Sequence, residues 1–137
     1  MSIRNCHFIE LPKISDSRGN LTFVEGGNHI PFELRRVFYL YDVPVGAERG
    51  GHSHKTSEQF LIAISGSFDL ILDDAHGKKL VHLSRPNQGF HVCPMVWCEL
   101  GDFSMDAVCM VLTSDKFDEN DYYRDYHEYC GAVGVMK

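Results

Sequence analysis

The sequence lacks any long apolar segment, since no run approaches the roughly 18 apolar residues that a membrane-spanning helix needs. The opening residues MSIRNCHFIELPK contain no hydrophobic stretch of the signal-peptide kind. Basic residues are also scarce: 13 Lys and Arg stand against 19 Asp and Glu, which gives a formal net charge of −6 over 137 residues. No basic cluster is longer than the pairs Arg35-Arg36 and Lys78-Lys79. We therefore expect a cytoplasmic protein with no membrane segment and no nucleic-acid surface.

Cysteine is present, but its spacing does not indicate a fold held together by disulfide bonds. The five cysteines are odd in number, widely spaced and without a CxxC pair; they are Cys6, Cys93, Cys98, Cys109 and Cys130. Neither a disulfide framework nor a zinc ribbon fits this spacing. We interpret most of them as small buried side chains in a reducing compartment.

Short strand-like segments separated by turn residues make up most of the chain. No amphipathic segment of helix length lies among them, so we predict an all-β fold, a single-domain sandwich or barrel over residues 1–137. In the last part, residues 118–130, tyrosines at positions 122, 126 and 129 have helical spacing and predict a short helical or irregular tail against the barrel. The expected strands are residues 21–25, 35–42, 58–64, 67–73, 78–83, 89–93, 96–100 and 106–113.

The segment GAERGGHSHKTSE, residues 46–58, has the spacing of the first cupin signature. His52 and His54 leave one face of a strand, and Glu58 follows near the next bend, so three ligands can converge on a divalent metal. A second cupin stretch would normally add a histidine, but GFHVCPMVWC, residues 89–98, has Cys98 at that place. A site of two histidines, one glutamate and one cysteine is unusual, which weakens the metal interpretation.

Proton transfer is the alternative for the same residues. An imidazole gives and takes protons near neutral pH, and two of them on one wall can serve adjacent carbons of one substrate. Glu58 would then orient one ring by a hydrogen bond rather than bind metal. That both histidines merely face solvent, without a role, stays open on the residues alone.

Other candidates for ligand binding are polar or aromatic residues near predicted turns and strand faces. Arg18 and Arg49 each precede a glycine, where a guanidinium can grip a phosphate, although a solvated turn residue is the commoner role. Tyr39 lies on a strand face that we expect to look into the barrel, where its hydroxyl can bond a sugar oxygen or its ring can fill the core. Trp97 precedes Cys98 in a strand expected at the mouth, where it can stack on a base or sugar or simply fill the barrel.

Over roughly residues 10–129 the chain resembles the WxcM-like cupins, in particular the dTDP-4-keto-6-deoxy-D-glucose 3,4-ketoisomerases. The similarity is carried by RGGHSHKTSEQ, PMVW and VLTSDKFDENDYYRDY. It implies a homodimeric jelly-roll β-barrel that uses no metal and no cofactor. It also implies an enzyme that moves the keto group of a dTDP-linked sugar from C4 to C3 through an enediol or enediolate, toward 3-amino-3,6-dideoxyhexoses of surface glycans such as O-antigens and S-layer glycans.

The resemblance also implies roles for single residues. The paired histidines fall on His52 and His54, of which we favour His54 as the base at C3, and the active-site tyrosine falls on Tyr39. Arg18 and Arg49 suit the pyrophosphate or the sugar hydroxyls. We further expect Glu58, Trp97 and Cys98 at the substrate, with Cys98 standing where the family commonly has histidine. A nucleotide-sugar 3,5-epimerase, a metal-dependent cupin oxygenase and a non-catalytic sugar-nucleotide binding module remain alternatives.

Overall fold

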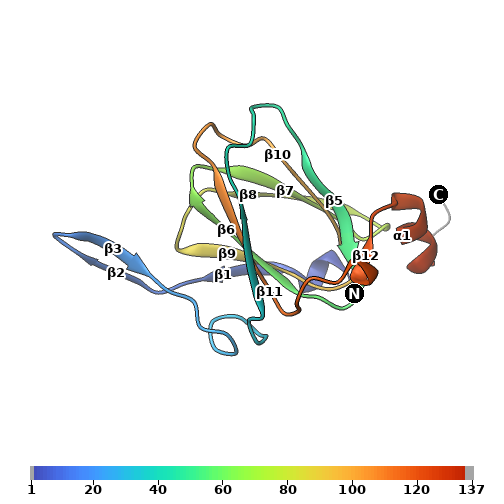
Figure 1. Cartoon of the computed structure of the whole chain (residues 1–137), viewed down its shortest axis with the longest axis horizontal. Coiled ribbons are helices and arrows are strands. Elements are labelled where there is room, and N and C mark those ends of the chain that lie inside the picture. Colours follow the sequence, from blue (N-terminus) through green and yellow to red (C-terminus); the bar gives the residue numbers. More distant parts are fainter. Residues whose placement is uncertain (1, 135–137) are drawn as a thin grey trace.

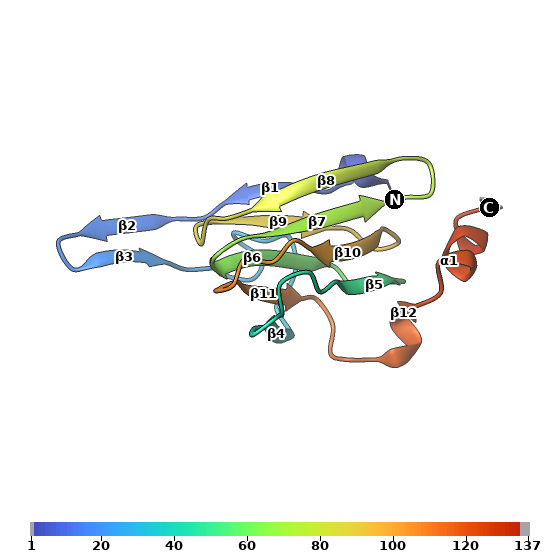
Figure 2. The same ribbon diagram turned by 90° about the horizontal axis from the view of Figure 1, so that it is seen from above.

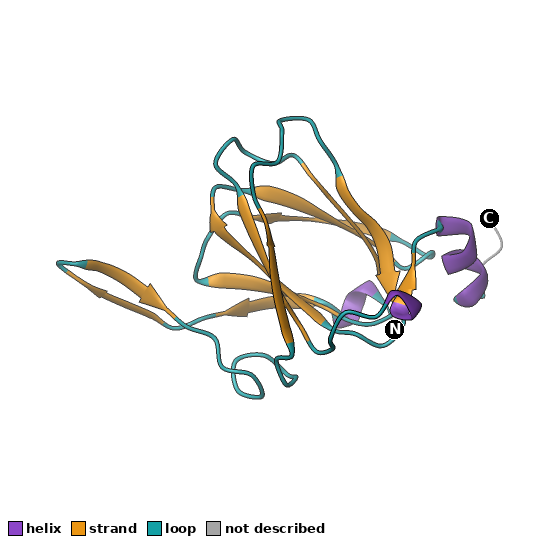
Figure 3. Ribbon diagram, viewed as in Figure 1, coloured by secondary structure: helices purple, strands orange, loops and turns teal. Residues whose placement is uncertain are grey.

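The computed structural model describes residues 2–134, and antiparallel strands joined by loops and turns dominate it (Figures 1 and 3). The strands are β1 (His7–Glu10), β2 (Lys13–Asp16), β3 (Gly19–Thr22), β4 (Arg36–Leu40), β5 (Arg49–His54), β6 (Gln59–Ser65), β7 (Phe68–Asp73), β8 (Lys78–Leu83), β9 (Gln88–Val92), β10 (Trp97–Gly101), β11 (Val108–Thr113) and β12 (Tyr122–Tyr123). The helical elements are two 3-10 turns, η1 (Ile3–Asn5) and η2 (Glu119–Asp121), and the helix α1 (Tyr126–Ala132). No helix within residues 2–134 is long and apolar enough to cross a membrane.

Two five-stranded sheets face one another, in the orders β1-β9-β6-β11-β4 and β12-β5-β10-β7-β8. The inward side chains of both sheets form one large apolar cluster, which includes Leu61, Phe68, Leu72, Phe90 and Val111. Two facing antiparallel sheets that share such a core make a jelly-roll barrel of the cupin type. The all-β prediction and the short C-terminal helix are therefore confirmed.

Both sheets are also covered on parts of their outer faces. In β6, Leu61 and Ala63 face the main core, whereas Phe60 and Ile62 belong to a second apolar cluster with Ile30 and Phe32 of the segment between β3 and β4. A third cluster lies under α1, where Trp97 packs with Tyr129 and Cys130. Because apolar residues occur on both faces of these strands, hydrophobicity alone does not say which face looks inward.

A two-stranded hairpin, β2–β3, extends away from the barrel (Figures 1 and 2). Its apolar side chains Ile14 and Leu21 are 58% and 56% exposed, and Phe23 just after it is 39% exposed. At the opposite end of the molecule, the segment after β11 returns to the barrel, pairs β12 with β5 and ends in α1. The sequence patterns did not predict β1, β2 or β12, and they placed the beginning of β5 in a turn.

Candidate active site

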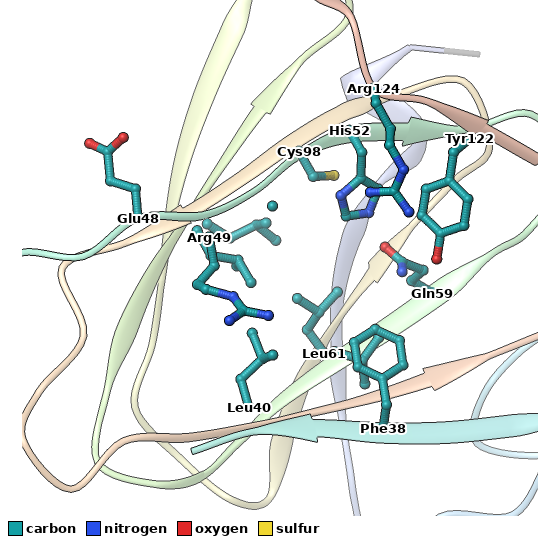
Figure 4. A pocket seen from close by; sticks show the side chains of 14 residues that line it. Phe38, Leu40, Glu48, Arg49, His52, Gln59, Leu61, Cys98, Tyr122 and Arg124 are labelled. Atoms are coloured by element: carbon teal, nitrogen blue, oxygen red, sulfur yellow. The ribbon is translucent and has the colours of Figure 1, made fainter. Parts of the chain in front are cut away.

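A cavity of about 370 Å³ opens into the barrel between the two sheets (Figure 4). Its size is within the range of small-molecule sites. The apolar part of its lining comes from both sheets and consists of Phe38, Leu40, Leu61, Leu70, Leu100 and Val111. The remaining lining residues, apart from Gly50, carry polar groups: Glu48, Arg49, His52, Gln59, Cys98, Tyr122 and Arg124. An apolar chamber with a few convergent polar groups is the usual form of a binding or catalytic site.

His52, in β5, is the histidine on the cavity wall. Its Nε2 atom is buried and has no hydrogen-bond partner among the described residues. Burial, followed by the nearby His54 and Arg124, lowers the pKa of His52 to about 4, although a hydrogen bond with the Gly50 backbone opposes the shift. The ring is therefore neutral at pH 7 and holds a free lone pair, which is the state of a general base.

His54 lies beside His52, with the ring centroids 5.0 Å apart in an edge-to-face arrangement. This proximity agrees with the shared strand face that the spacing predicted. His54 is only 5% exposed and does not line the cavity, and its Nε2, like that of His52, has no hydrogen-bond partner among the described residues. The cavity therefore favours His52 over the expected His54 as the group that meets a ligand. Its Nδ1 lies 2.8 Å from the Asp121 carboxylate, which fixes the orientation of the ring.

Asp121 is the orienting carboxylate that the sequence interpretation missed. Its oxygens accept hydrogen bonds from the Ser57 hydroxyl at 2.6 Å and from the Thr56 amide and hydroxyl, both at 2.8 Å. Burial favours the neutral acid, but the hydrogen bonds from Ser57, His54 and Thr56 outweigh it and hold the pKa of Asp121 at about 2. Burial in turn lowers the pKa of His54, and the bond to Asp121 only partly offsets this.

Tyr122 and Arg124 reach the cavity from the C-terminal segment. Tyr122 pairs with His54 across β12 and β5, and its ring centroid lies 5.3 Å from that of His52 and 4.4 Å from that of His54. The Arg124 guanidinium covers the Tyr122 ring at 4.1 Å from the centroid. Neither residue was expected at the site, because a strand of two residues so far along the chain leaves no periodic signal.

Arg49 and Cys98 lie at the cavity, as expected. Gly50, between Arg49 and Gly51, has φ of +91°, and a Cβ there would lie 3.1 Å from the Cys98 carbonyl oxygen, so this bulged pairing of β5 with β10 needs glycine. Burial strongly raises the pKa of the Cys98 thiol, which therefore stays protonated. Its Sγ donates a long bond to the Val96 carbonyl at 3.7 Å.

Tyr39 and Trp97 point out of the barrel, and both expectations for them are wrong. In β4, Phe38 and Leu40 line the cavity, so the alternating Tyr39 is on the outer face, 57% exposed. In β10, Cys98 faces inward, and Trp97 packs under α1, with its ring centroid 5.4 Å from that of Tyr126. The one-residue alternation of a strand accounts for both corrections.

Glu58 is separated from the two histidines, so neither role expected for it is met. It precedes β6, and its Oε1 lies 2.8 Å from Nε2 of His91 in β9. Among residues 2–134, no three His, Cys, Asp or Glu side chains are arranged to hold a metal ion. The three-ligand set of His52, His54 and Glu58 is thus not assembled.

Arg18 lies in the turn between β2 and β3 and does not line the cavity of its own chain. The hairpin that carries it extends away from the barrel (Figure 1). Its side chain is 86% exposed and makes an ion pair of 2.6 Å with Asp16. A role for Arg18 at a substrate therefore requires a second copy of the chain.

The jelly-roll barrel, with a cavity that holds a neutral histidine, a tyrosine and two arginines, defines a ligand-binding cupin. A family model described as FdtA, WxcM-like, C-terminal, matches residues 4–134. The chain belongs to this WxcM-like family.

Individual relatives agree with that assignment. The chain is 45% identical to a TDP-4-oxo-6-deoxy-alpha-D-glucose-3,4-oxoisomerase of Aneurinibacillus thermoaerophilus, over 88% of this chain and 87% of that protein. A 3,4-ketoisomerase structure from Helicobacter canadensis superimposes with a TM-score of 0.92 at 38% identity, covering 94% of this chain and 97% of the other. A histidine-to-asparagine mutant of the 3,4-ketoisomerase QdtA from Thermoanaerobacterium thermosaccharolyticum, in complex with TDP-4-keto-6-deoxyglucose, matches equally well at 37% identity, with 94% of both chains covered.

Proposed function

We propose that this protein is a nucleotide-sugar 3,4-ketoisomerase that converts TDP-4-keto-6-deoxyglucose into the corresponding 3-keto sugar. Its relatives, a TDP-4-oxo-6-deoxy-alpha-D-glucose-3,4-oxoisomerase and two 3,4-ketoisomerases, support the substrate class. The observation that carries the reaction type is His52, a neutral imidazole on the cavity wall whose Nε2 has no partner among residues 2–134. This group is free to take a carbon-bound proton from a ligand in the chamber.

The proposed reaction begins when His52 removes the proton at C3, which is acidified by the ketone at C4. The electron pair of the C–H bond forms the C3=C4 double bond of an enediol or enediolate. His52 exchanges its proton with solvent and then delivers a proton to C4. His54 does not touch the substrate in this proposal. The His54 ring packs against the His52 ring, and Asp121 holds the His54 ring in one orientation.

The charged end of the ligand is proposed to lie between Arg49 and Arg124. These guanidinium groups come from β5 and from the C-terminal segment and line the same cavity. Two arginines on one opening suit a diphosphate, whose oxygens accept paired hydrogen bonds. Cys98 is proposed to contact the sugar as a neutral thiol, because its raised pKa keeps the proton on sulfur.

A homodimer is the proposed assembly, because it gives Arg18 a function and covers an apolar surface. An outer groove of the barrel is lined by Val37, Ile62, Ile64 and Met110, together with Phe23 at the base of the hairpin. The hairpin's own Ile14 and Leu21 are exposed as well. In a two-fold dimer each hairpin covers the partner's barrel, and its tip carries Arg18 toward the partner's cavity.

We also propose that residues 1–137 form one domain and that the protein acts in the cytoplasm. Support for the compartment is that all five cysteines are buried free thiols, as expected under reducing conditions. A 3-keto product of this kind is a substrate for amination, so we propose a place in the synthesis of 3-amino-3,6-dideoxyhexoses of surface glycans such as O-antigens or S-layer glycans.

The direct test is to incubate the purified protein with TDP-4-keto-6-deoxyglucose in heavy water with excess EDTA and to follow the sugar by NMR. We expect the ketone to move to C3 and deuterium to appear at C4, at an EDTA-independent rate. A ketone that stays at C4 while a ring configuration changes would identify an epimerase. Turnover that requires added metal would contradict the proposal.

A further inference from the structure

The isomerisation proposed above moves two protons, one between carbon atoms and one between oxygen atoms. His52 accounts for the carbon-bound proton, but O4 must gain a proton and O3 must lose one. Tyr39, the tyrosine expected for such a role, lies on the outer face of β4. The second proton carrier must therefore be another group that lines the cavity.

Few lining residues can both give and take a proton. The Cys98 thiol is held protonated by burial, and Figure 4 shows the Glu48 carboxylate directed away from the cavity. The amide of Gln59 and the guanidinium groups of Arg49 and Arg124 do not exchange protons in this way. Apart from His52, this leaves the hydroxyl of Tyr122.

The position of Tyr122 suits this task. Its ring packs beside both imidazoles, at 5.3 Å from His52 and 4.4 Å from His54, while the hydroxyl reaches into the chamber toward Gln59 and Phe38 (Figure 4). The Arg36 guanidinium donates to the Tyr122 hydroxyl oxygen at 3.5 Å. The Arg124 guanidinium lies over the ring, so cations from two different segments adjoin this phenol.

We infer that Tyr122 is a catalytic residue of the ketoisomerase, which carries the proton between O4 and O3; the inference rests on the proposed function. As His52 removes the C3 proton, the C–H electron pair forms C3=C4, and the C4=O π pair moves to O4, which takes the phenol proton. The phenolate then removes the O3 proton, the O–H pair forms C3=O, and the double-bond electrons take a proton from His52 at C4. Both side chains return to their starting states.

The test compares Tyr122→Phe with Tyr123→Phe, a matched control on the same strand. Tyr123 does not line the cavity; it lies near Tyr129, at 6.4 Å between ring centroids, and under Lys55. General acid–base catalysis contributes about 100-fold or more, so we expect Tyr122→Phe to lower kcat by at least that factor. TDP affinity should stay within about threefold, and Tyr123→Phe should remain near wild type.

Isotope exchange separates a proton carrier from a packing residue. In heavy water, an enediolate formed without Tyr122 returns mostly to substrate, so deuterium at C3 of recovered substrate should rise by about tenfold relative to product. A Tyr122→Phe enzyme with wild-type kcat overturns the inference, and so does one whose kcat falls with no change in this ratio. If the wild-type protein converts no 4-keto sugar, the proposed function itself fails.

If Tyr122→Phe does not fold, as judged by its melting curve, 3-fluorotyrosine at position 122 replaces it. This residue keeps the ring and hydroxyl but makes the phenol more acidic. We expect the alkaline limb of the kcat profile to move to lower pH; an unchanged profile overturns the inference.

Discussion

The bond between Asp121 and His54 makes a strong prediction, because it joins residues far apart in sequence at a distance of 2.8 Å. The change is Asp121→Asn, which keeps the shape of the side chain and its acceptor for Ser57 or Thr56 but removes the charge. A hydrogen bond to a charged group contributes about 1.5–3 kcal/mol. Taking about 2 kcal/mol as the loss that loosens the His54 ring beside His52, kcat should fall by roughly 30-fold.

The assay is NMR-followed turnover of TDP-4-keto-6-deoxyglucose, with kcat and KM determined separately. Because Asp121 does not line the cavity, KM should change by no more than about threefold. Asp118→Asn is the matched control: Asp118 caps the η2 turn by accepting from the Asn120 amide at 3.0 Å, in the same segment. If Asp121→Asn keeps wild-type kcat, or raises KM while sparing kcat, Asp121 does not position the His52–His54 pair.

Three further predictions follow from the site and its surroundings. With a His52 pKa of about 4, kcat/KM should be level near neutral pH and fall as the pH drops through 4 and the lone pair is lost; a midpoint near 6.5 would contradict the buried, neutral base. Mixing inactive Arg18→Ala with inactive His52→Asn should restore roughly a quarter of wild-type activity through mixed dimers with one complete site, whereas no recovery would rule out exchange of Arg18 between subunits. Glu58→Gln should leave kcat within about twofold, because Glu58 bonds His91 and neither His52 nor His54. A large loss of kcat in the same assay would show that Glu58 takes part in the reaction.

The sequence predicted the strands more reliably than the direction of their side chains. Eight of the strands were expected close to where they lie, because alternating apolar runs and turn residues are local signals. Trp97 was placed on the wrong face because the helix α1 buries part of the outer surface of β10. Tyr39 was misplaced because both alternating sets of side chains in β4 include apolar or aromatic residues, although the outer set is exposed. When both faces of a strand are apolar, neither is marked as the inner one.

The histidine pair was predictable from its next-but-one spacing, but its supporting residues were not. Asp121, Tyr122 and Arg124 reach β5 only because the chain returns after β11. The sequence interpretation chose Glu58 as the orienting carboxylate because it is near in sequence, whereas the bond to His54 is made by a residue 67 positions away. Contacts of this kind depend on topology, and a single sequence does not show them.

The short C-terminal segment has a consequence for the order in which the enzyme becomes competent during its synthesis. A ribosome releases the strands through β11 before it releases Asp121, Tyr122 and Arg124. The nascent barrel can thus close its core while its chamber still lacks these three groups. In the proposed mechanism, turnover requires the returning segment to dock on β5, so the apolar core can form before the site is complete.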